Sequence, residues 1–279
     1  MADRKKEGNV MAAKIAVIGG GNMGGGMVRG ICRACAGENV TVYDHHPEKM
    51  AALERDTGCK LAENEAQAVR DADYILLTVK PYGVEPVIDA VAGNLRDGQV
   101  LVSAAAGVPI AALEAAAAKT GRRLAVVRLM PNTPVSLGAG VVLAACGQAV
   151  TEQQKQGLAT LLAGCGLLEW GTEQQLDAGM AISGCGPAYV YMLIEAMADG
   201  GVEIGLPREK AQRLAAQTLM GAAQMVLQTG QHPGALKDAV CSPGGCTIAG
   251  VAALEERGFR AAAAMAVKAA DAKNRGLTK

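Results

Sequence analysis

The segment DAVCSPGGCTIAG, residues 238–250, sets a proline and two adjacent glycines into a region whose other residues favour helix. Such a break ends one helix and starts another, and the first amides of a helix have no partner within it. These amides and the positive end of the helix dipole attract negative charge. We therefore expect this turn to bind a small anion, through Ser242, Gly244, Gly245, Cys246 and Thr247.

A purely structural interpretation of the same turn stays open. Pro-Gly pairs are common in turns that bind nothing. The Thr247 hydroxyl would then be the N-cap of the second helix, because threonine caps helices well. Residue types alone favour this alternative.

A second glycine-rich stretch, KIAVIGGGNMGGGMVRGI, covers residues 14–31. Its β-branched start predicts a strand, its glycines a turn, and its later apolar spacing a helix. The glycines match GxGxxG, in which the first permits a tight turn, the second lets the backbone approach a pyrophosphate, and the third lets helix and strand pack closely. The pattern alone is weak, because a flexible turn also contains glycines. The predicted cofactor-binding residues are Gly19, Gly21, Asn22, Met23 and Gly24.

The next predicted strand, NVTVYD, ends in Asp44, twenty residues beyond Gly24. A carboxylate at this spacing accepts a hydrogen bond from an adenosine ribose hydroxyl, which completes a dinucleotide-binding βαβ unit. Asp44 should repel a 2′-phosphate and so favours NADH, whereas His45, His46 and Lys49 could supply positive charge for NADPH. The histidines are also ordinary residues for an exposed turn. NADH and NADPH therefore both stay open.

Three further apolar runs, at residues 74–80, 99–107 and 122–132, continue an alternation of strands with helices. Near-continuous apolar runs are typical of buried parallel strands, and ligands of such sheets bind beyond the carboxyl ends of the strands. The cofactor-binding candidates at these ends are Val79, Lys80, Pro81, Ala105, Ala106 and Asn132. All of them are also ordinary loop residues, and a residue before proline commonly ends an element.

The composition limits the class of protein. A length of 279 residues suggests two domains, because a typical domain has about 150 residues. The 27 Lys and Arg residues balance the 27 Asp and Glu residues, which leaves no basic field for nucleic acid or an anionic membrane. No window has the roughly 18 uninterrupted apolar residues of a membrane span. We expect a cytoplasmic protein that binds a small molecule, and neither nucleic acid nor membrane.

The eight cysteines are scattered, mostly in apolar surroundings, and we expect reduced, buried thiols. Cys32 and Cys35 form a CxxC pair, but no second pair or nearby histidine completes the four ligands of a zinc site, so we expect no metal. Cys241 and Cys246 flank the glycines of the late turn. They are either small loop residues or a redox pair, and the absence of a redox motif favours the former.

Strand patterns stop after residue 170, and helical patterns follow. Proline and glycine predict one helix over residues 207–230, and a last helix extends from residue 247 toward residue 273. Apolar residues on several faces of these alanine-rich helices indicate burial against a partner subunit. The sequence thus predicts a dinucleotide-binding α/β domain over residues 12–170 and an all-helical substrate-binding and dimerisation domain over residues 171–279.

Seven segments, in their order and spacing, resemble the pyrroline-5-carboxylate reductase family: GGGNMG, TVKP, SAAAGV, MPNTP, SGCGPAYVYMLIEAMADGG, TGQHPGALKD and AVCSPGGCTIAGVAALEERGFR. The resemblance extends from residue 14 to about residue 272. It implies NAD(P)H-dependent reduction of L-1-pyrroline-5-carboxylate to L-proline, the last step of proline biosynthesis. It also implies an N-terminal Rossmann-type doubly wound sheet followed by an all-α dimerisation domain, in homodimers that commonly assemble into decamers.

The resemblance assigns roles to the late turn. The amides of Gly245 and Cys246 and the hydroxyl of Ser242 would receive the substrate carboxylate, and Thr247 would be the catalytic residue that hydrogen-bonds the ring nitrogen. The active site would form between the nucleotide domain and the dimer helices. A family contact with the adenosine ribose maps to Asn64.

The chain departs from the family pattern in two places. Many members have a small polar residue where this chain has Asp44, sometimes followed by arginine where it has His45, so the family's usual preference for NADPH does not carry over. Cys185 stands where members often have serine, a change that affects packing more than chemistry.

Reduction of a cyclic imine fits these residues, because a protonated imine is already electrophilic and Thr247 can orient it without a general acid. The leading alternative, a β-hydroxyacid dehydrogenase, needs a proton donor, typically a lysine on the first long helix of the second domain. Residues 186–197 contain no lysine. A dinucleotide-sensing protein without catalysis is a further alternative, which would need the cofactor glycines but not the late turn.

Overall fold

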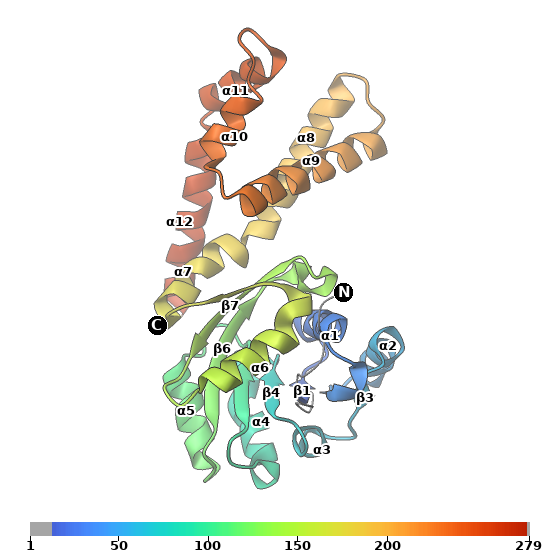
Figure 1. Cartoon of the computed structure of the whole chain (residues 1–279), viewed down its shortest axis with the longest axis vertical. Coiled ribbons are helices and arrows are strands. Elements are labelled where there is room, and N and C mark those ends of the chain that lie inside the picture. The colour runs from blue at the N-terminus through green and yellow to red at the C-terminus, as the bar shows by residue number, and fades with distance from the viewer. Residues whose placement is uncertain (1–12, 278–279) are drawn as a thin grey trace, which may run out of the picture. The chain divides into compact units, whose positions relative to one another are not determined.

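The computed structural model describes residues 13–277, which divide into two compact units. The first comprises the described chain up to Gly184 together with the segment from Asn274, and the second comprises Cys185–Lys273 (Figure 1). The predicted domains, 12–170 and 171–279, were defined by their binding roles, whereas these units are defined by contacts within the chain. The predicted division therefore stays a prediction. Residues 12, 278 and 279 of those ranges lie outside the described residues.

The first unit is built on an eight-stranded sheet of order β3-β2-β1-β4-β5-β6-β7-β8. The neighbouring strands are parallel except for β6 and β7, which are antiparallel. Because the chain turns back across β1 to reach β4, the sheet has a topological switch point between them, where such folds bind ligands. The strands are β1 Ile15–Ile18, β2 Val40–Tyr43, β3 Lys60–Leu61, β4 Tyr74–Leu77, β5 Val100–Ser103, β6 Ala125–Pro131, β7 Gly140–Cys146 and β8 Gly166–Trp170.

Helices cover both faces of this sheet, which confirms the predicted doubly wound architecture (Figure 1). The α-helices of the first unit are α1 Asn22–Ala34, α2 Pro47–Thr57, α3 Glu65–Val69, α4 Val84–Val91, α5 Ile110–Lys119, α6 Glu152–Leu162 and α7 Glu173–Ser183. The predicted strands are present, but β3, β7 and β8 were not predicted. The chain reverses direction between β6 and β7, so β7 pairs with β6 antiparallel. This pairing differs from the predicted alternation of parallel strands with helices.

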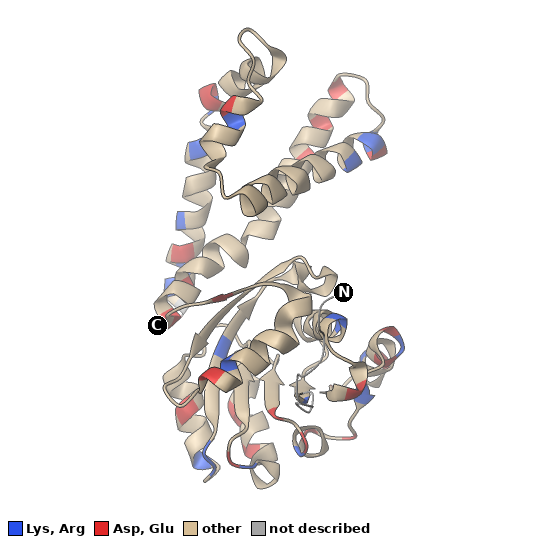
Figure 2. Cartoon of the chain, viewed as in Figure 1, with Lys and Arg blue, Asp and Glu red and all other residues tan. Residues whose placement is uncertain are grey.

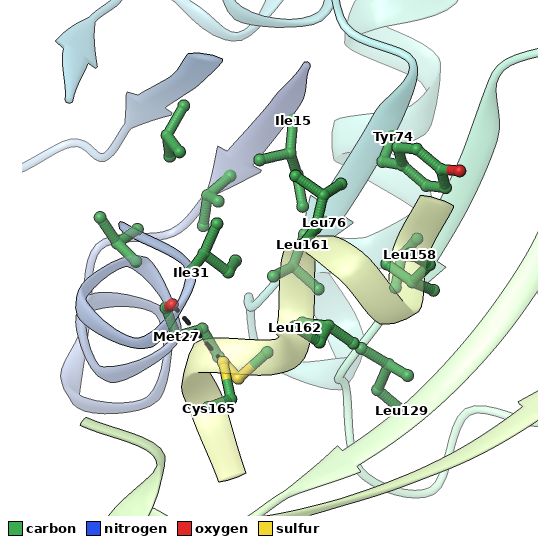
Figure 3. Close-up of a cluster of buried hydrophobic side chains, with 14 of the residues drawn as sticks. Ile15, Met27, Ile31, Tyr74, Leu76, Leu129, Leu158, Leu161, Leu162 and Cys165 are labelled. Carbon is green, nitrogen blue, oxygen red and sulfur yellow. Dashed lines mark hydrogen bonds between the residues drawn. The ribbon is translucent and has the colours of Figure 1, made fainter. Parts of the chain in front are cut away.

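The two faces of the sheet belong to two separate cores. Successive strand residues alternate between them: Ile15 and Val17 lie in one core, and Ala16 and Ile18 in the other. Burial on both faces explains why the strands are almost uninterrupted apolar runs. Figure 3 shows the core between α1, α6 and the strands, which contains Ile15, Met27, Ile31, Leu76, Leu158, Leu161 and Leu162.

A buried charge joins α7 to the sheet. The Arg128 side chain of β6 is 2% exposed, and its guanidinium donates to Glu173 Oε1 at 2.9 Å and to Asp177 Oδ1 at 2.7 Å. Glu173 Oε1 also accepts from the Ile110 amide at the start of α5, at 2.7 Å. One carboxylate therefore serves both helices, and the buried arginine holds it in place.

We expect Arg128→Met to lower the free energy of unfolding by about 2–4 kcal/mol, because it leaves two partly buried carboxylates without their cation. Urea denaturation of the purified protein measures the effect. Arg123→Met is the matched control, because Arg123 pairs with Asp97 on the surface with its side chain 91% exposed, and such pairs contribute less than about 1 kcal/mol. Equal stability losses in the two variants would contradict the role of Arg128.

The second unit consists of helices, as predicted: α8 Gly186–Glu203, α9 Arg208–Thr229, α10 Pro233–Ala239, α11 Cys246–Glu256 and α12 Phe259–Leu277. The limits predicted for α9 are confirmed, since Pro207 is its N-cap and Gly230 ends it with a left-handed φ of 64°. The single last helix predicted from residue 247 is wrong. Gly258, with a φ of 71°, separates α11 from α12, because such a left-handed residue ends a helix.

Small residues pack α8 against α9. Ala198 is fully buried between them, and Ala211 and Ala215 are 4% exposed. Much of the larger apolar surface of the unit stays exposed in the single chain, including Tyr191, Met192, Met220, Met225, Leu227 and Met265. Figure 2 shows that the charged residues of α8 and α9 gather toward the turn that joins them. Within residues 13–277, no helix is long and apolar enough to cross a bilayer.

Candidate functional site

The turn between β1 and α1 has the geometry expected of a dinucleotide-binding loop. Gly19 has a φ of 106°, and a Cβ there would lie 3.0 Å from Thr78 Oγ1. A Cβ at Gly24 would lie 1.8 Å from the Gly19 carbonyl oxygen, so only glycine allows α1 to approach the turn this closely. A Cβ at Gly21 would meet nothing within 4 Å. The three glycines thus provide a tight turn, an open approach and a close helix contact.

Polar contacts hold this loop to the neighbouring strand and leave the helix start open. The Thr78 hydroxyl, just beyond β4, donates to the Gly19 carbonyl at 2.6 Å. Helix α1 begins with Gly21 as its N-cap, and no side chain caps it. The amides of its first turn have no partner within the helix, so they can bind an anion such as a phosphate.

A pocket of about 970 Å³ opens beside this loop, beyond the carboxyl ends of β1, β2, β4, β5 and β6. This is the edge at which open α/β sheets bind their ligands. The structure brings most of the predicted cofactor-binding residues together there: Gly19, Gly21, Asn22, Met23, Asp44, His45, Val79, Lys80, Pro81 and Ala106. Other lining residues include His46 and Lys49, which we considered for NADPH, and Glu65, Thr78, Tyr82, Ala104 and Met130, which we did not predict.

Four predicted cofactor-binding residues do not line the pocket, and each makes a contact within the fold. Gly24 provides the close contact described above, and Ala105 is a buried core residue. Asn64 caps α3 by accepting a hydrogen bond from the Gln67 amide at 2.8 Å. Asn132 is 7% exposed and joins two segments, accepting from the Val141 amide at 2.8 Å and donating to the Ser183 carbonyl at 2.9 Å.

The Asp44 carboxylate lies at the end of β2 and is held from two sides. Its Oδ2 accepts from the Gly20 amide at 2.6 Å, and its Oδ1 accepts from the His46 amide at 2.9 Å and lies 2.7 Å from His46 Nδ1. Burial by itself raises the pKa of the Asp44 carboxyl, but the hydrogen bonds from His46 and Gly20 outweigh burial and hold that pKa below its usual range. Asp44 is therefore ionised at neutral pH.

The late turn lies in the second unit and starts α11 on a glycine. Gly245 is the N-cap of α11, and Gly244 before it has a left-handed φ of 67°. A Cβ at Gly245 would lie 2.2 Å from the Ser242 hydroxyl oxygen, so a larger residue there would displace that hydroxyl. Thr247 therefore does not cap the helix, so the predicted N-cap role of Thr247 is wrong, whereas anion binding by this turn stays a prediction.

The predicted anion-binding groups of this turn lie within six residues of one another, with one difference from expectation. The Gly245 amide, expected to be free, donates to the Ser242 carbonyl at 3.0 Å and closes the turn. Cys246 is the first residue of α11, where the amide has no partner within the helix. The hydroxyls of Ser242 and Thr247 flank this helix start.

The cysteines form no disulfide in the described part of the chain, and Cys241 and Cys246 are not joined. Burial raises the pKa of the Cys32 thiol to about 11 and that of the Cys165 thiol to about 12, so both are protonated at neutral pH. Over residues 13–277, no group of three or more His, Cys, Asp or Glu side chains is placed to hold a metal ion.

Two family models match this chain, one for each part. Residues 14–107 match the family described as NADP oxidoreductase coenzyme F420-dependent, and residues 173–277 match the family described as pyrroline-5-carboxylate reductase dimerisation. The second match includes α7, which packs on the sheet of the first unit, and all helices of the second unit.

Individual proteins resemble the chain over nearly its whole length. Pyrroline-5-carboxylate reductase from Escherichia coli (strain K12) is 40% identical over 272 residues, which cover 96% of this chain and 100% of that protein. A pyrroline-5-carboxylate reductase structure from Coxiella burnetii has a TM-score of 0.87 at 31% identity, covering 96% of this chain and 99% of that chain. The structure of Plasmodium falciparum pyrroline carboxylate reductase with NADP bound has a TM-score of 0.81 at 32% identity. The match covers 96% of this chain and 98% of that chain. This chain belongs to the pyrroline-5-carboxylate reductase family.

Proposed function

We propose that this protein reduces L-1-pyrroline-5-carboxylate to L-proline with NADH or NADPH, the last step of proline biosynthesis. One observation carries the proposal: a chain 40% identical to a pyrroline-5-carboxylate reductase over that protein's full length combines a GxGxxG pocket with a glycine-capped turn that presents Ser242 and Thr247. A protein that only senses dinucleotides has no use for the second feature.

The pocket of the first unit would hold the dinucleotide. The open space at Gly21 lets a pyrophosphate approach the backbone, and the uncapped amides at the start of α1 can bind its oxygens. Pocket residues beyond β4 and β5, including Val79 and Ala104, would then enclose the remaining length of the cofactor. When bound, the reduced nicotinamide supplies the hydride for the ring carbon.

The turn before α11 would hold the substrate. We assign the Cys246 amide and the Ser242 hydroxyl as the main donors to the substrate carboxylate. The Gly245 amide is less available, because it already donates a hydrogen bond within the turn. Gly244 supplies the left-handed residue that shapes the turn. The Thr247 hydroxyl would orient the ring nitrogen and assist delivery of its proton, directly or through water. A protonated imine needs no stronger acid.

The second unit would also form the subunit interface. The family model for dimerisation matches residues 173–277, and the large apolar side chains left exposed on α8, α9 and α12 need a covering surface. We propose a homodimer built on these helices. Its further assembly into a decamer, a cytoplasmic location and the division of roles at residue 170 belong to the same proposal.

The proposed reaction is tested by oxidation of NADPH and NADH, side by side, in the presence of pyrroline-5-carboxylate. We expect substrate-dependent loss of absorbance at about 340 nm and proline as the product, detected by mass spectrometry. A β-hydroxyacid is the control substrate and should be inert with the oxidised cofactors, because α8 contains no lysine to act as the proton donor. Binding of dinucleotide without proline formation would favour the sensing alternative.

We expect Gly21→Ala to weaken dinucleotide binding by roughly tenfold or more, which is about 1.4 kcal/mol, because its methyl group occupies the approach path of the pyrophosphate. The fold should be unaffected, since a Cβ there meets nothing within 4 Å. Isothermal titration with the dinucleotide, together with the melting temperature, measures both effects. Gly24→Ala is the contrast: it should lower the melting temperature, because its Cβ would meet a backbone oxygen at 1.8 Å.

The two hydroxyls of the late turn should have separable effects. Thr247→Ala should lower kcat by about tenfold to a hundredfold with dinucleotide affinity unchanged, because the hydroxyl acts on the ring nitrogen during reduction. Ser242→Ala should chiefly raise the substrate KM, because it removes one donor to the carboxylate. Steady-state kinetics with varied substrate and cofactor separate these outcomes. Loss of dinucleotide binding in either variant would contradict the placement of the substrate in this turn.

A further inference from the structure

The pocket of the first unit has two carboxylates near the end of β2. Asp44 lines the pocket at the end of that strand, and Glu65 lines it from the start of α3. Lys49 of α2 also lines it, and Lys80 follows β4, two strands away from β2 in the sheet. Two strands correspond to roughly 9–10 Å. Of the two lysines of the lining, Lys49 therefore comes from the helix that directly follows β2.

The Asp44 carboxylate is fixed in this position. Its Oδ2 is held by the Gly20 amide and its Oδ1 by both the amide and the ring nitrogen of His46, at distances of 2.6–2.9 Å. Gly20 itself belongs to the cofactor loop, so the carboxylate is anchored to the loop that would bind the pyrophosphate. Rotating this side chain away from an incoming phosphate would break all three hydrogen bonds.

The two neighbouring histidines already have carboxylate or phenol partners. His46 Nδ1 pairs with Asp44 at 2.7 Å. The His45 ring lies 3.3 Å from the Tyr43 hydroxyl through Nδ1 and 3.8 Å from Glu65 Oε1 through Nε2. A 2′-phosphate would have to compete with these partners for both rings, and the other cations of the lining are Lys49 and Lys80.

We propose that Asp44 sets the cofactor preference of this protein, by accepting a hydrogen bond from the 2′-hydroxyl of NADH and repelling the 2′-phosphate of NADPH. A carboxylate at the end of the second strand is the group that recognises an unmodified adenosine ribose. The inference rests on the proposed function for its cofactor class, and it goes further because that function leaves the choice between the two nicotinamides open.

Binding to the purified full-length protein tests the inference without turnover. NADH and NADPH are titrated separately by isothermal calorimetry or by the fluorescence of the bound nicotinamide. We expect the Kd for NADPH to exceed that for NADH by about tenfold or more at low salt. Raising the ionic strength should lower the ratio of the two Kd values, because salt screens the repulsion between the Asp44 carboxylate and the 2′-phosphate.

Two variants identify the responsible charge. Asp44→Asn keeps the size of the side chain and an oxygen for the Gly20 amide but removes the negative charge, so the ratio of the two Kd values should fall by about tenfold. Glu48→Gln is the matched control: it removes a carboxylate from α2, one residue before Lys49, at a position that does not line the pocket. The ratio of the two Kd values in Glu48→Gln should equal that in the unmodified protein.

The outcomes separate this inference from the proposed function. Tighter binding of NADPH than of NADH by the unmodified protein, or an unchanged ratio in Asp44→Asn, would overturn the role of Asp44 while proline formation still supported the reductase. Preferential binding of NADH without reduction of pyrroline-5-carboxylate would support the role of Asp44 and remove the proposed reaction. Should Asp44→Asn fail to fold, the ratio in the unmodified protein and its salt dependence still decide.

Discussion

The first unit depends on one close contact between backbones. At Gly24, helix α1 comes so near the Gly19 carbonyl that any side chain would overlap it. This contact sets the direction in which α1 leaves β1, and the Thr78 hydroxyl holds the same carbonyl from the next strand. The open start of α1, the pocket beyond the strands and the position of Asp44 beside Gly20 all follow from this packing. A larger residue at Gly24 would shift all three together.

The two units use the same local device at positions more than two hundred residues apart. Helix α1 starts on Gly21 and helix α11 on Gly245, both with extended backbone, and neither has a side-chain cap. Other helices of the chain satisfy a first amide with a polar side chain, as Thr151 does for α6 and Thr172 for α7. A glycine cap leaves those amides available to a ligand instead. To these two helix starts we assign the phosphate and carboxylate groups of the ligands.

Side chains of β6 and the residue after it secure α7 at both ends. Arg128 pairs with Glu173 and Asp177 in the first half of the helix, and Asn132 donates to the carbonyl of Ser183 at its end. Arg128 is almost fully enclosed, whereas its partners Glu173 and Asp177 stay about one third exposed. Helix α7 therefore belongs to the sheet although the family model for dimerisation begins with it.

The sequence by itself determined those features that depend on neighbouring residues. The glycine spacing of residues 19–24, the apolar runs of the central strands and the limits of α9 at Pro207 and Gly230 all follow from local backbone preferences. Most predicted cofactor residues also line the pocket, because the ends of parallel strands meet at one edge of a sheet.

Only the tertiary structure decided which of these residues line the pocket and which make contacts within the fold. Asn132 follows a predicted strand and Asn64 precedes a helix, as ligand-binding residues often do. In the structure, however, the side-chain amides of both residues form hydrogen bonds with backbone groups. The antiparallel course of β7, the burial of Arg128 and the enclosure of Asp44 by Gly20 and His46 depend on contacts between distant segments or on side-chain direction. Such contacts leave no regular spacing in the sequence, because packing in three dimensions selects them.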